Sequence, residues 1–392
     1  MRLLILSDLF SLDSWLIHDE EPVIMPAVYE FFNHLGRSEE HSFDCIMFHE
    51  TARAKKTFPN GSAIQVHPLS IPFHYPRKFI SLFAMRGMAQ RMIARQSYDV
   101  IYGMSIYSTV AARLGHKNKI LSVSRIFGSL IYDVMQKKQS LKLYTRHILQ
   151  YAETKYPCDT IICTEDGTQF DKALEIINPG QRVHMLYNGI NDQLRAQLLS
   201  FERVKEIKRN QKIKLISIGR LTKWKRHDLS IRTLFELVHT HKVDASLCII
   251  GSGELRQQLR KLVDTLSLQE HVKFKEGIAH HDMPSEILNY DIGLFLYDAS
   301  NLGNALWETA LSGRLLVVRG TGKTGDLFQH LTNALVVTDD PVEIANSIIE
   351  ILDQDISRMT DQSSAMVKEL LPSWQDRIVL EMDIIRDALK RT

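Results

Sequence analysis

Short apolar runs alternate with stretches of helical spacing along the first half of the chain. Runs rich in β-branched and aromatic residues, bounded by polar or turn residues, predict strands at RLLILSD, FDCIMFH, AIQVHPL, DVIYGMS, KILSVSR, DTIICTE and RVHMLYN. Apolar residues at helical spacing predict helices over 24–35, 78–96, 104–114, 141–154 and 168–176. Strands that alternate with helices predict a parallel sheet with helices on both faces.

The same alternation starts again after a polar, charged stretch that ends near Gln211. It predicts strands at IKLISIG, ASLCIIG, VKFKEG, DIGLFLY, RLLVVRG and NALVVT, and helices over 228–240, 254–266, 283–289 and 304–312. Behind Pro372, SWQDRIVLEMDIIRDALKRT predicts an amphipathic helix. We therefore expect two doubly wound α/β domains, with ligands bound in the cleft between them.

The domain limits follow from these two series. We place the N-terminal domain at 1–190, a linker at 191–211, the C-terminal domain at 212–371 and a final helix at 372–392. A chain of 392 residues favours two domains, or three, over one.

Composition and charge exclude some classes of protein and partner. Lys and Arg total 48 and Asp and Glu total 46, and a net charge of +2 does not indicate a nucleic-acid partner. The four cysteines form no C-x-x-C pair, so we expect reduced thiols in a cytoplasmic protein. MRLLILSDLF predicts a first strand rather than a signal peptide, and no apolar stretch approaches the ~18 residues of a membrane span. We expect a protein that is soluble or peripherally attached to a membrane.

The stretch SIGRLTKWKRHD places two cations just beyond a predicted strand. Arg220 and Lys225 lie five residues apart, and a planar guanidinium with a point-charge ammonium suits a diphosphate. The alternative is a solvated basic turn, because Lys223 and Arg226 are also nearby.

The stretch YDASNLGNALWETALSGR places a helix start near Gly303 or Asn304, after a loop of small polar residues. A helix N-terminus offers N–H groups and the positive end of a dipole to an anion. Glu308 lies about one turn into the helix, where its carboxylate can accept hydrogen bonds from ribose hydroxyls. The alternative is an acid that merely stabilises the first turns of a helix.

These two stretches together resemble the two-part donor signature of GT-B glycosyltransferases. IIGSGE, VKFKEGI and MPSEILNYDIGLFLY fall between them in the order and spacing of that group, so residues 210–340 resemble glycosyltransferase family 4. In the first half, MLYNGI, SRIFGSL and CTEDGTQFD are similar to strand-end and cleft loops of the same family.

The resemblance implies a GT-B fold of two Rossmann-like domains, with the final helix crossing back to the N-terminal domain. It also implies a retaining hexosyltransferase that needs no metal or other cofactor. Arg220 and Lys225 would neutralise the diphosphate leaving group, Glu308 would hold the ribose, and the backbone at Gly277 and Ile278 would contact the base. The partners would be a nucleotide sugar and a sugar or lipid-linked glycan acceptor on the N-terminal domain, in surface polysaccharide or glycoconjugate synthesis.

The chain departs from the family pattern at several positions. Ser300 stands where the first of two glutamates is usual, so we expect Asn301 and the N–H groups of Leu302 and Gly303 to contact sugar or phosphate instead. SDLFSLDSW replaces a glycine-rich loop. Arg125 stands where a cleft histidine is usual, either facing the sugar or phosphate or forming a structural salt bridge. Two alternatives remain open: a UDP-sugar 2-epimerase-like enzyme, and a catalytically weak sugar-nucleotide-binding protein.

The remaining motifs give weaker evidence of function. GTGKTG lacks the first glycine of a P-loop, because that position is Val317, and GSGE has Arg256 where a dinucleotide motif needs its last glycine. The acids of 353–355 and the histidine pairs at 239–241 and 280–281 are expected at the surface. The basic, amphipathic segment 75–96 indicates a helix packed on the sheet with its cations in solvent; the alternative is contact with an anionic membrane.

Overall fold

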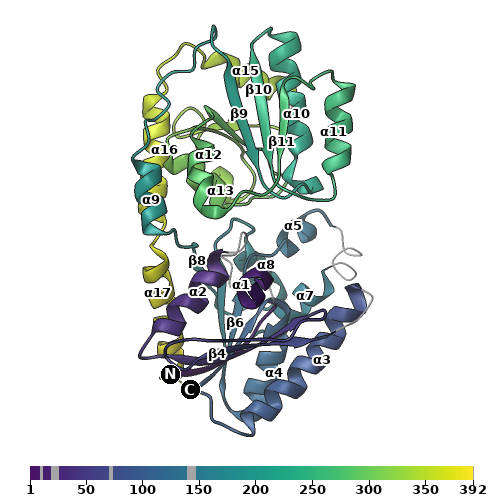
Figure 1. Ribbon diagram of the computed structural model, residues 1–392, viewed down its shortest axis with the longest axis vertical. Coiled ribbons are helices and arrows are strands. Elements are labelled where there is room, and N and C mark those ends of the chain that lie inside the picture. The colour runs from purple at the N-terminus through teal and green to yellow at the C-terminus, as the bar shows by residue number, and fades with distance from the viewer. Residues whose placement is uncertain (9–11, 19–25, 70–73, 139–146, 392) are drawn as a thin grey trace. The chain divides into compact units, whose positions relative to one another are not determined.

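The computed structural model describes residues 1–8, 12–18, 26–69, 74–138 and 147–391 (Figure 1). The chain forms two compact units. Unit 1 comprises Met1–Glu165, Gln169–Gly189 and Pro372–Thr392, and unit 2 comprises Asp166–Thr168 and Ile190–Leu371. Each unit is built on one sheet, so each is described by itself.

Unit 1 is built on an eight-stranded sheet in the order β3-β4-β2-β1-β5-β6-β7-β8. Every pairing is parallel except that of β3 with β4. The strands are β1 (Arg2–Leu6), β2 (Ser42–His49), β3 (Ala54–Thr57), β4 (Ala63–Pro68), β5 (Val100–Met104), β6 (Leu121–Ile126), β7 (Thr160–Thr164) and β8 (His184–Leu186).

The apolar run of β1 is explained by burial on both faces of this sheet. Leu3 and Ile5 pack into one hydrophobic layer, whereas Leu4 and Leu6 pack into the other. Because alternate side chains of a strand point to opposite faces, a strand covered on both sides needs a continuous apolar run. The described helices of unit 1 are α1 (Asp13–His18), α2 (Pro26–Arg37), α3 (His74–Ile93), η1 (Ser105–Tyr107), α4 (Ser108–Asn118), α5 (Ile131–Gln136), α7 (Ile148–Lys155), α8 (Phe170–Ile177) and α17 (Trp374–Leu389).

Helix α17 belongs to the core of unit 1, although it comes last in the sequence. The Ser373 hydroxyl caps it by accepting a hydrogen bond from the N–H of Asp376 at 3.0 Å. Ile378, Met382 and Ile385, spaced by four and three residues, are buried in the same layer as Leu3 and Ile5. The helix therefore completes one face of the unit 1 sheet.

Unit 2 is built on a six-stranded parallel sheet in the order β11-β10-β9-β12-β13-β14. Its strands are β9 (Ile213–Ile218), β10 (Ala245–Ile250), β11 (Val272–Lys275), β12 (Ile292–Phe295), β13 (Leu315–Arg319) and β14 (Leu335–Val337). The order reverses between β9 and β12, which are neighbours in space but not in sequence. In doubly wound sheets, ligands bind beyond the carboxyl ends of the strands at this reversal.

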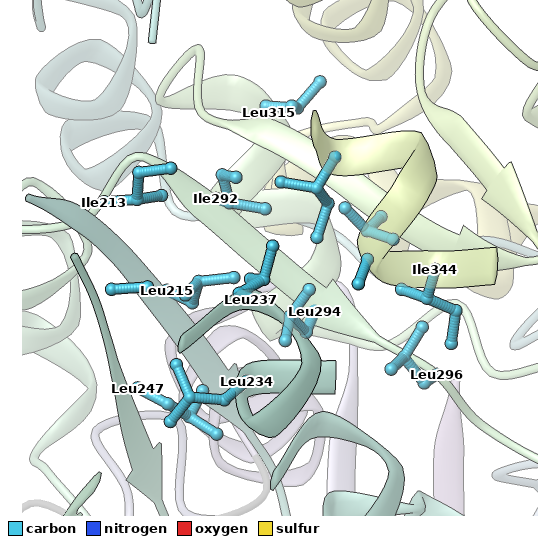
Figure 2. Close-up of a cluster of buried hydrophobic side chains, with 14 of the residues drawn as sticks. Ile213, Leu215, Leu234, Leu237, Leu247, Ile292, Leu294, Leu296, Leu315 and Ile344 are labelled. Atoms are coloured by element: carbon cyan, nitrogen blue, oxygen red, sulfur yellow. The ribbon is translucent and has the colours of Figure 1, made fainter. Parts of the chain in front are cut away.

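Helices cover both faces of the unit 2 sheet. Figure 2 shows side chains of β9, β10 and β12 meeting those of α10, η3 and α15 in one apolar core. The described helices are α9 (Asp192–Leu199), η2 (Lys223–Lys225), α10 (His227–Phe235), η3 (Glu236–Thr240), α11 (Arg256–Thr265), η4 (His280–Asp282), α12 (Met283–Ile287), α13 (Asn304–Leu311), α14 (Lys323–Leu327), α15 (Pro341–Glu350) and α16 (Ser357–Leu370).

The structure corrects the sequence analysis in two respects: it contains elements that were not expected, and the expected linker is part of unit 2. Strand β3, helix α1 and helix α5 were not expected in unit 1, and α14, α15 and α16 were not expected in unit 2. The stretch 191–211, expected to be a linker, packs within unit 2 and contains α9. Asn191 caps α9 by accepting from the N–H groups of Gln193 and Leu194, and Leu194 and Leu198 are buried. Of the predicted helix 141–154, residues 141–146 lie outside the described part of the chain.

Candidate functional site

Arg220 and Lys225 follow the carboxyl end of β9, at the reversal of strand order in unit 2. Arg220 is exposed, whereas Lys225 is buried at the end of η2. Nζ of Lys225 donates a hydrogen bond to Oδ1 of Asn301 at 2.7 Å. Asn301 lies in the loop after β12, on the other side of the reversal. The hydrogen bond therefore joins the two strand ends between which such sheets bind ligands.

Two aromatic rings hold the same ammonium group. Nζ of Lys225 lies 3.6 Å from the ring centroid of Tyr297 and 4.3 Å from that of Trp224. The face of an aromatic ring attracts a cation and replaces part of its hydration. The Tyr297 hydroxyl donates to the carbonyl oxygen of Ile218 at 3.1 Å, which fixes this ring at the end of β9.

Burial makes the charge of Lys225 costly. Burial and the nearby charge of Arg220 lower the pKa of Lys225 to about 7, against an opposing contribution from Asp166. An anion bound beside Arg220 and Lys225 would favour the charged lysine and raise this pKa. The arrangement therefore suits a ligand that brings negative charge into the site.

The loop after β12 leads directly into α13, whose N-cap residue is Gly303. No side chain caps this helix start, and the positive end of its dipole favours an anion near Asn304. The structure corrects one expectation here. The N–H of Leu302 donates to the carbonyl oxygen of Asp166 at 2.6 Å, so it is engaged within the protein rather than directed at a ligand.

Ser300 connects this loop to the first turn of α14, the helix that follows β13. Its buried hydroxyl lies 2.8 Å from Oγ1 of Thr324 and accepts a hydrogen bond from the N–H of Thr324 at 3.0 Å. Thr324 belongs to the GTGKTG stretch and is the second residue of α14, so its N–H and hydroxyl serve a contact between this helix and the loop after β12. This use of Thr324 agrees with the mismatch of GTGKTG to a P-loop.

Glu308 lies one turn into α13, with its side chain buried. The helix begins in the same loop that carries Asn301, so the carboxylate and the Lys225 ammonium belong to the same end of the sheet. A buried carboxylate is costly unless it is paired or hydrogen-bonded. Its contact with a ribose stays a prediction.

Gly277 and Ile278 lie after β11, two strands away from β9. Gly277 is exposed, and a Cβ there would meet no atom within 4 Å. Ile278 is half-buried against an apolar cluster that includes Ile216 and Ile218 of β9. Both residues are thus at the carboxyl edge of the same sheet, and their contact with a base stays a prediction.

The GSG turn after β10 has a structural use. Gly251 has φ 143°, and a Cβ on it would lie 2.1 Å from the carbonyl oxygen of Gly219. A Cβ on Gly253 would lie 2.6 Å from the carbonyl oxygen of Leu221. These glycines let the end of β10 approach the loop that carries Arg220. The close approach of the two backbones accounts for the glycines, so the motif does not require a bound dinucleotide.

Asp298 was not expected from the sequence, and it connects three segments of unit 2. Its Oδ1 accepts hydrogen bonds from Nη1 of Arg226 at 2.8 Å and from Nη1 of Arg319 at 2.7 Å. Its N–H donates to the carbonyl oxygen of Trp224 at 2.9 Å. The sequence feature that could have pointed to this ion pair is that Asp298 and Arg319 each lie at or just after the end of a predicted strand.

Arg125 lies in unit 1, at the end of β6, and is buried. Its Nε is 3.5 Å from Oε2 of Glu381 on α17, and its Nη1 donates to the carbonyl oxygen of Ile126 at 2.7 Å. Glu381 also pairs with Nη1 of Arg377 at 2.6 Å and accepts from the hydroxyl of Tyr102. The structure thus contains the salt bridge that was the alternative for Arg125; a catalytic role stays a prediction.

Other acidic and metal-binding candidates are accounted for. Asp353 accepts a hydrogen bond from the N–H of Arg209 at 3.0 Å, and Asp355 accepts one from the N–H of Ser357 at 2.9 Å, so both acids hold the backbone. Within the described ranges, no three His, Cys, Asp or Glu side chains form a group that could hold a metal ion.

Two family models match the chain. The model for glycosyl transferases group 1 matches residues 200–366, and the model for glycosyl transferase 4-like proteins matches residues 37–165. The first range contains the strand ends that carry Arg220, Lys225, Asn301 and Glu308.

Relatives from two organisms have similar sequences. An uncharacterized glycosyltransferase of Methanocaldococcus jannaschii is 25% identical over 53% of this chain and 54% of its own length. A GDP-mannose-dependent alpha-(1-6)-phosphatidylinositol monomannoside mannosyltransferase of Mycobacterium tuberculosis is 26% identical over 35% of this chain and 38% of its own length. The chain thus matches about half or less of the length of these curated relatives.

A solved structure shows the same architecture. The crystal structure of Anabaena Alr3699/HepE in complex with UDP and glucose matches over all of both chains, with a TM-score of 0.66 and 15% identity. At that identity the likeness shows the fold alone. With two parallel-sheet α/β units and the two family matches, this chain belongs to the group 1, family 4 type of glycosyltransferases and has the GT-B fold.

Proposed function

We propose that this protein transfers a sugar from a nucleotide-diphosphate sugar to a hydroxyl acceptor. The observation that carries the proposal is the buried ammonium of Lys225, next to Arg220 at the carboxyl end of β9. As the bond between sugar and diphosphate breaks, negative charge grows on the leaving phosphate. Two cations placed there in advance stabilise that charge.

The other residues of the site receive roles that fit their positions. The start of α13 faces phosphate, Glu308 accepts hydrogen bonds from the ribose, and the backbone at Gly277 and Ile278 contacts the base. We propose that Arg220 and Lys225 supply the positive charge for which other transferases use a metal ion. We also propose that the configuration of the sugar is retained, as is usual in this family.

The donor base can be identified by thermal stability. UDP is bound in the Anabaena structure and GDP-mannose is the donor of the mycobacterial relative, so both bases are candidates. A screen of UDP, GDP, ADP, CMP and their sugars should raise the melting temperature with one base only, since a ligand of the native state stabilises it. The Lys225→Met variant should lose this rise. A wild-type protein that no nucleotide stabilises would contradict the proposal.

There are two further candidates, and Ser300 favours the second, because its hydroxyl stands in place of a carboxylate and is hydrogen-bonded to Thr324. One is a sugar-nucleotide epimerase, which would convert the donor without an acceptor. The other is a binding protein that neither transfers nor hydrolyses the sugar. Incubation with the donor chosen by the screen, with and without glycan acceptors, distinguishes all three by their products.

We propose in addition that α3 rests on an anionic membrane, where it would meet a lipid-linked acceptor in surface polysaccharide or glycoconjugate synthesis. Ser81, Met85 and Ala89 of α3 are buried, whereas Phe83 is 72% exposed. Ile80 and Phe79 on the same helix are 44% and 39% exposed. The described helices contain none that is long and apolar enough to cross a membrane.

Exposed cations follow these exposed apolar residues in the sequence. Arg86 and Arg91 on the helix are exposed, as is Arg95 two residues beyond its end, and residues 79–95 contain no acid. Exposed aromatic residues next to cations favour the interface of an anionic membrane. We expect sedimentation with vesicles of phosphatidylglycerol and phosphatidylcholine, and less with phosphatidylcholine alone. Phe83→Ser and Arg86→Ser should weaken it, whereas Val342→Ser, at an exposed apolar residue of unit 2, should not. Equal sedimentation of all variants would contradict membrane contact.

A further inference from the structure

Lys225 is followed by a residue in an uncommon backbone conformation. Arg226 has φ 52° and ψ 38°, in the left-handed region that residues with a Cβ rarely adopt. Such a conformation persists only where its surroundings hold it. Two carboxylates hold Arg226: its Nη1 lies 2.8 Å from Oδ1 of Asp298, and its Nε lies 3.2 Å from Oδ1 of Asp228.

Asp298 contacts both chain neighbours of Lys225. Its carboxylate pairs with the side chain of Arg226, and its N–H donates to the carbonyl oxygen of Trp224 at 2.9 Å. Trp224 and Tyr297, the residue just before Asp298, are the two rings that face the Lys225 ammonium. Asp298 thus connects the segment that carries Lys225 to the segment that carries one of its rings.

Arg319 anchors Asp298 from a third segment. Nη1 of Arg319 lies 2.7 Å from Oδ1 of Asp298, and its Nη2 lies 3.4 Å from Oδ2 of Asp339. Arg319 is the last residue of β13, which is hydrogen-bonded to β12 in the sheet. The carboxylate of Asp298 is therefore attached to a rigid strand end, and a charge-assisted hydrogen bond of this kind is both short and directional.

We propose that Asp298 is a positioning residue for Lys225: with Arg226 and Arg319 it holds the loop after β9 so that the ammonium stays between the two rings and Asn301. The consequence for catalysis rests on the proposed function. Asp298 itself is assigned no contact with a substrate. Without its carboxylate, the loop loses its attachment to β13, and the Lys225 side chain becomes free to turn toward water.

The position of Lys225 can be measured without any substrate. In the NMR spectrum of protein labelled with ¹³C-lysine, the rings of Tyr297 and Trp224 shift the ε-methylene signal of Lys225 away from its usual position. The signal is assigned by its absence from the spectrum of Lys225→Arg. In Asp298→Asn we expect this displacement to be lost. We also expect the pKa of Lys225 to rise from about 7 toward its ordinary value, because burial is the main cause of its lowering.

The control repeats the same substitution on another ion pair of unit 2. Asp361 pairs with Nη1 of Arg203 at 2.6 Å and is exposed. Asp361→Asn should leave the Lys225 signal and the transfer rate unchanged. Asp298→Asn should lower the transfer rate on the order of 10²-fold, the cost of a small misplacement of a catalytic group.

A second variant tests the same proposal if Asp298→Asn does not fold. Arg226→Gly removes one partner of Asp298, and glycine accepts the left-handed conformation at this position. It should fold and show the same change of the Lys225 signal. The proposal is overturned if Lys225 keeps the wild-type chemical shift and pKa in Arg226→Gly. The same result in a folded Asp298→Asn variant also overturns it. A changed signal in a protein that transfers no sugar supports the positioning role and counts against the proposed function alone.

Discussion

Lys225 and Asn301 are 76 positions apart in the sequence, and a hydrogen bond of 2.7 Å joins their side chains. The bond bridges the two strand ends at which the unit 2 sheet reverses its order. An ammonium that is already held by an amide oxygen and two rings needs little rearrangement when an anion arrives. Such preorganisation is a main source of electrostatic catalysis.

Replacing Lys225 by methionine should reduce transfer while the fold is kept. The methionine side chain fills similar space without a buried charge, so the melting temperature should stay the same or rise. Transfer should fall by about 10²- to 10³-fold, as when one stabilising group for a developing negative charge is removed. Lys223→Met is the matched control, because Lys223 is exposed two residues earlier. A variant at Lys225 with the wild-type rate would remove this residue from the mechanism.

The affinity for a nucleoside diphosphate should fall as the pH rises above about 7. Lys225 has a pKa of about 7 in the free protein and loses its positive charge as the pH rises above that value. Since the bound anion raises the pKa of Lys225, the complex takes up a proton on forming near pH 8. Calorimetry in two buffers of different ionisation enthalpy measures that proton. In Lys225→Arg the uptake should vanish; uptake equal to that of wild type would show that another group titrates.

Glu308→Gln should weaken nucleotide binding by about 10- to 100-fold, since a hydrogen bond to a charged group contributes about 1.5–3 kcal/mol. The ribose contact can be isolated with the 2′-deoxy analogue of the preferred nucleoside diphosphate. Wild-type protein should bind the analogue more weakly than the parent nucleotide, whereas Glu308→Gln should bind both alike. Equal discrimination by both proteins in calorimetry would place Glu308 away from the ribose.

Glu381→Gln should destabilise unit 1 by about 3–5 kcal/mol, the cost of removing one partner from a buried ion pair. Glu381 and Arg377 are each 2% exposed, and the variant leaves Arg377 and Arg125 without their carboxylate. Glu40→Gln is the control: Glu40 pairs with Arg386 at the surface, where such pairs contribute about 1 kcal/mol or less. Denaturant unfolding followed by circular dichroism compares the two variants, and equal losses would contradict the structural role of Glu381.

The same carboxylate predicts a loss of stability in acid. Burial by itself would raise the pKa of Glu381, but the charges of Arg377 and Arg125 outweigh it and hold the pKa below its ordinary value. The ion pair therefore stabilises the fold above the unfolded-state pKa of about 4.3, and this contribution is lost as the pH falls through the lower folded-state pKa. Glu381→Gln should lack this part of the acid dependence.

The positions of Arg220, Lys225 and Glu308 could be found from the sequence because each follows a strand with a clear apolar pattern. Strand ends of a parallel sheet lie at one edge, so residues just after them are brought to one side. The contacts of Trp224 with Tyr297 and Asp298 could not be found in this way. They depend on β9 lying next to β12, and the linear pattern does not contain the order of strands in a sheet.

Helix α16 was missed for a different reason. Thr360, Ser363 and Ser364 are buried in it, so only Met359 and Val367 mark its inner face as apolar. The hydroxyl of Thr360 donates to the carbonyl oxygen of Val204, and that of Ser364 donates to the carbonyl oxygen of Leu311. Small polar side chains can be buried when the backbone supplies their hydrogen bonds. Hydrophobic periodicity does not detect such a helix.

The place of α17 in unit 1 has a consequence for synthesis of the chain on the ribosome. Ile378, Met382, Ile385 and the ion pair of Glu381 belong to a core whose other buried residues lie between Leu3 and Ile162 in the sequence. All of unit 2 leaves the ribosome before α17 does. A nascent chain thus carries an unfinished first unit, with one apolar face uncovered, throughout the translation of the second. The second unit can therefore be completed first, whereas the first unit can be completed only when its last helix has been made.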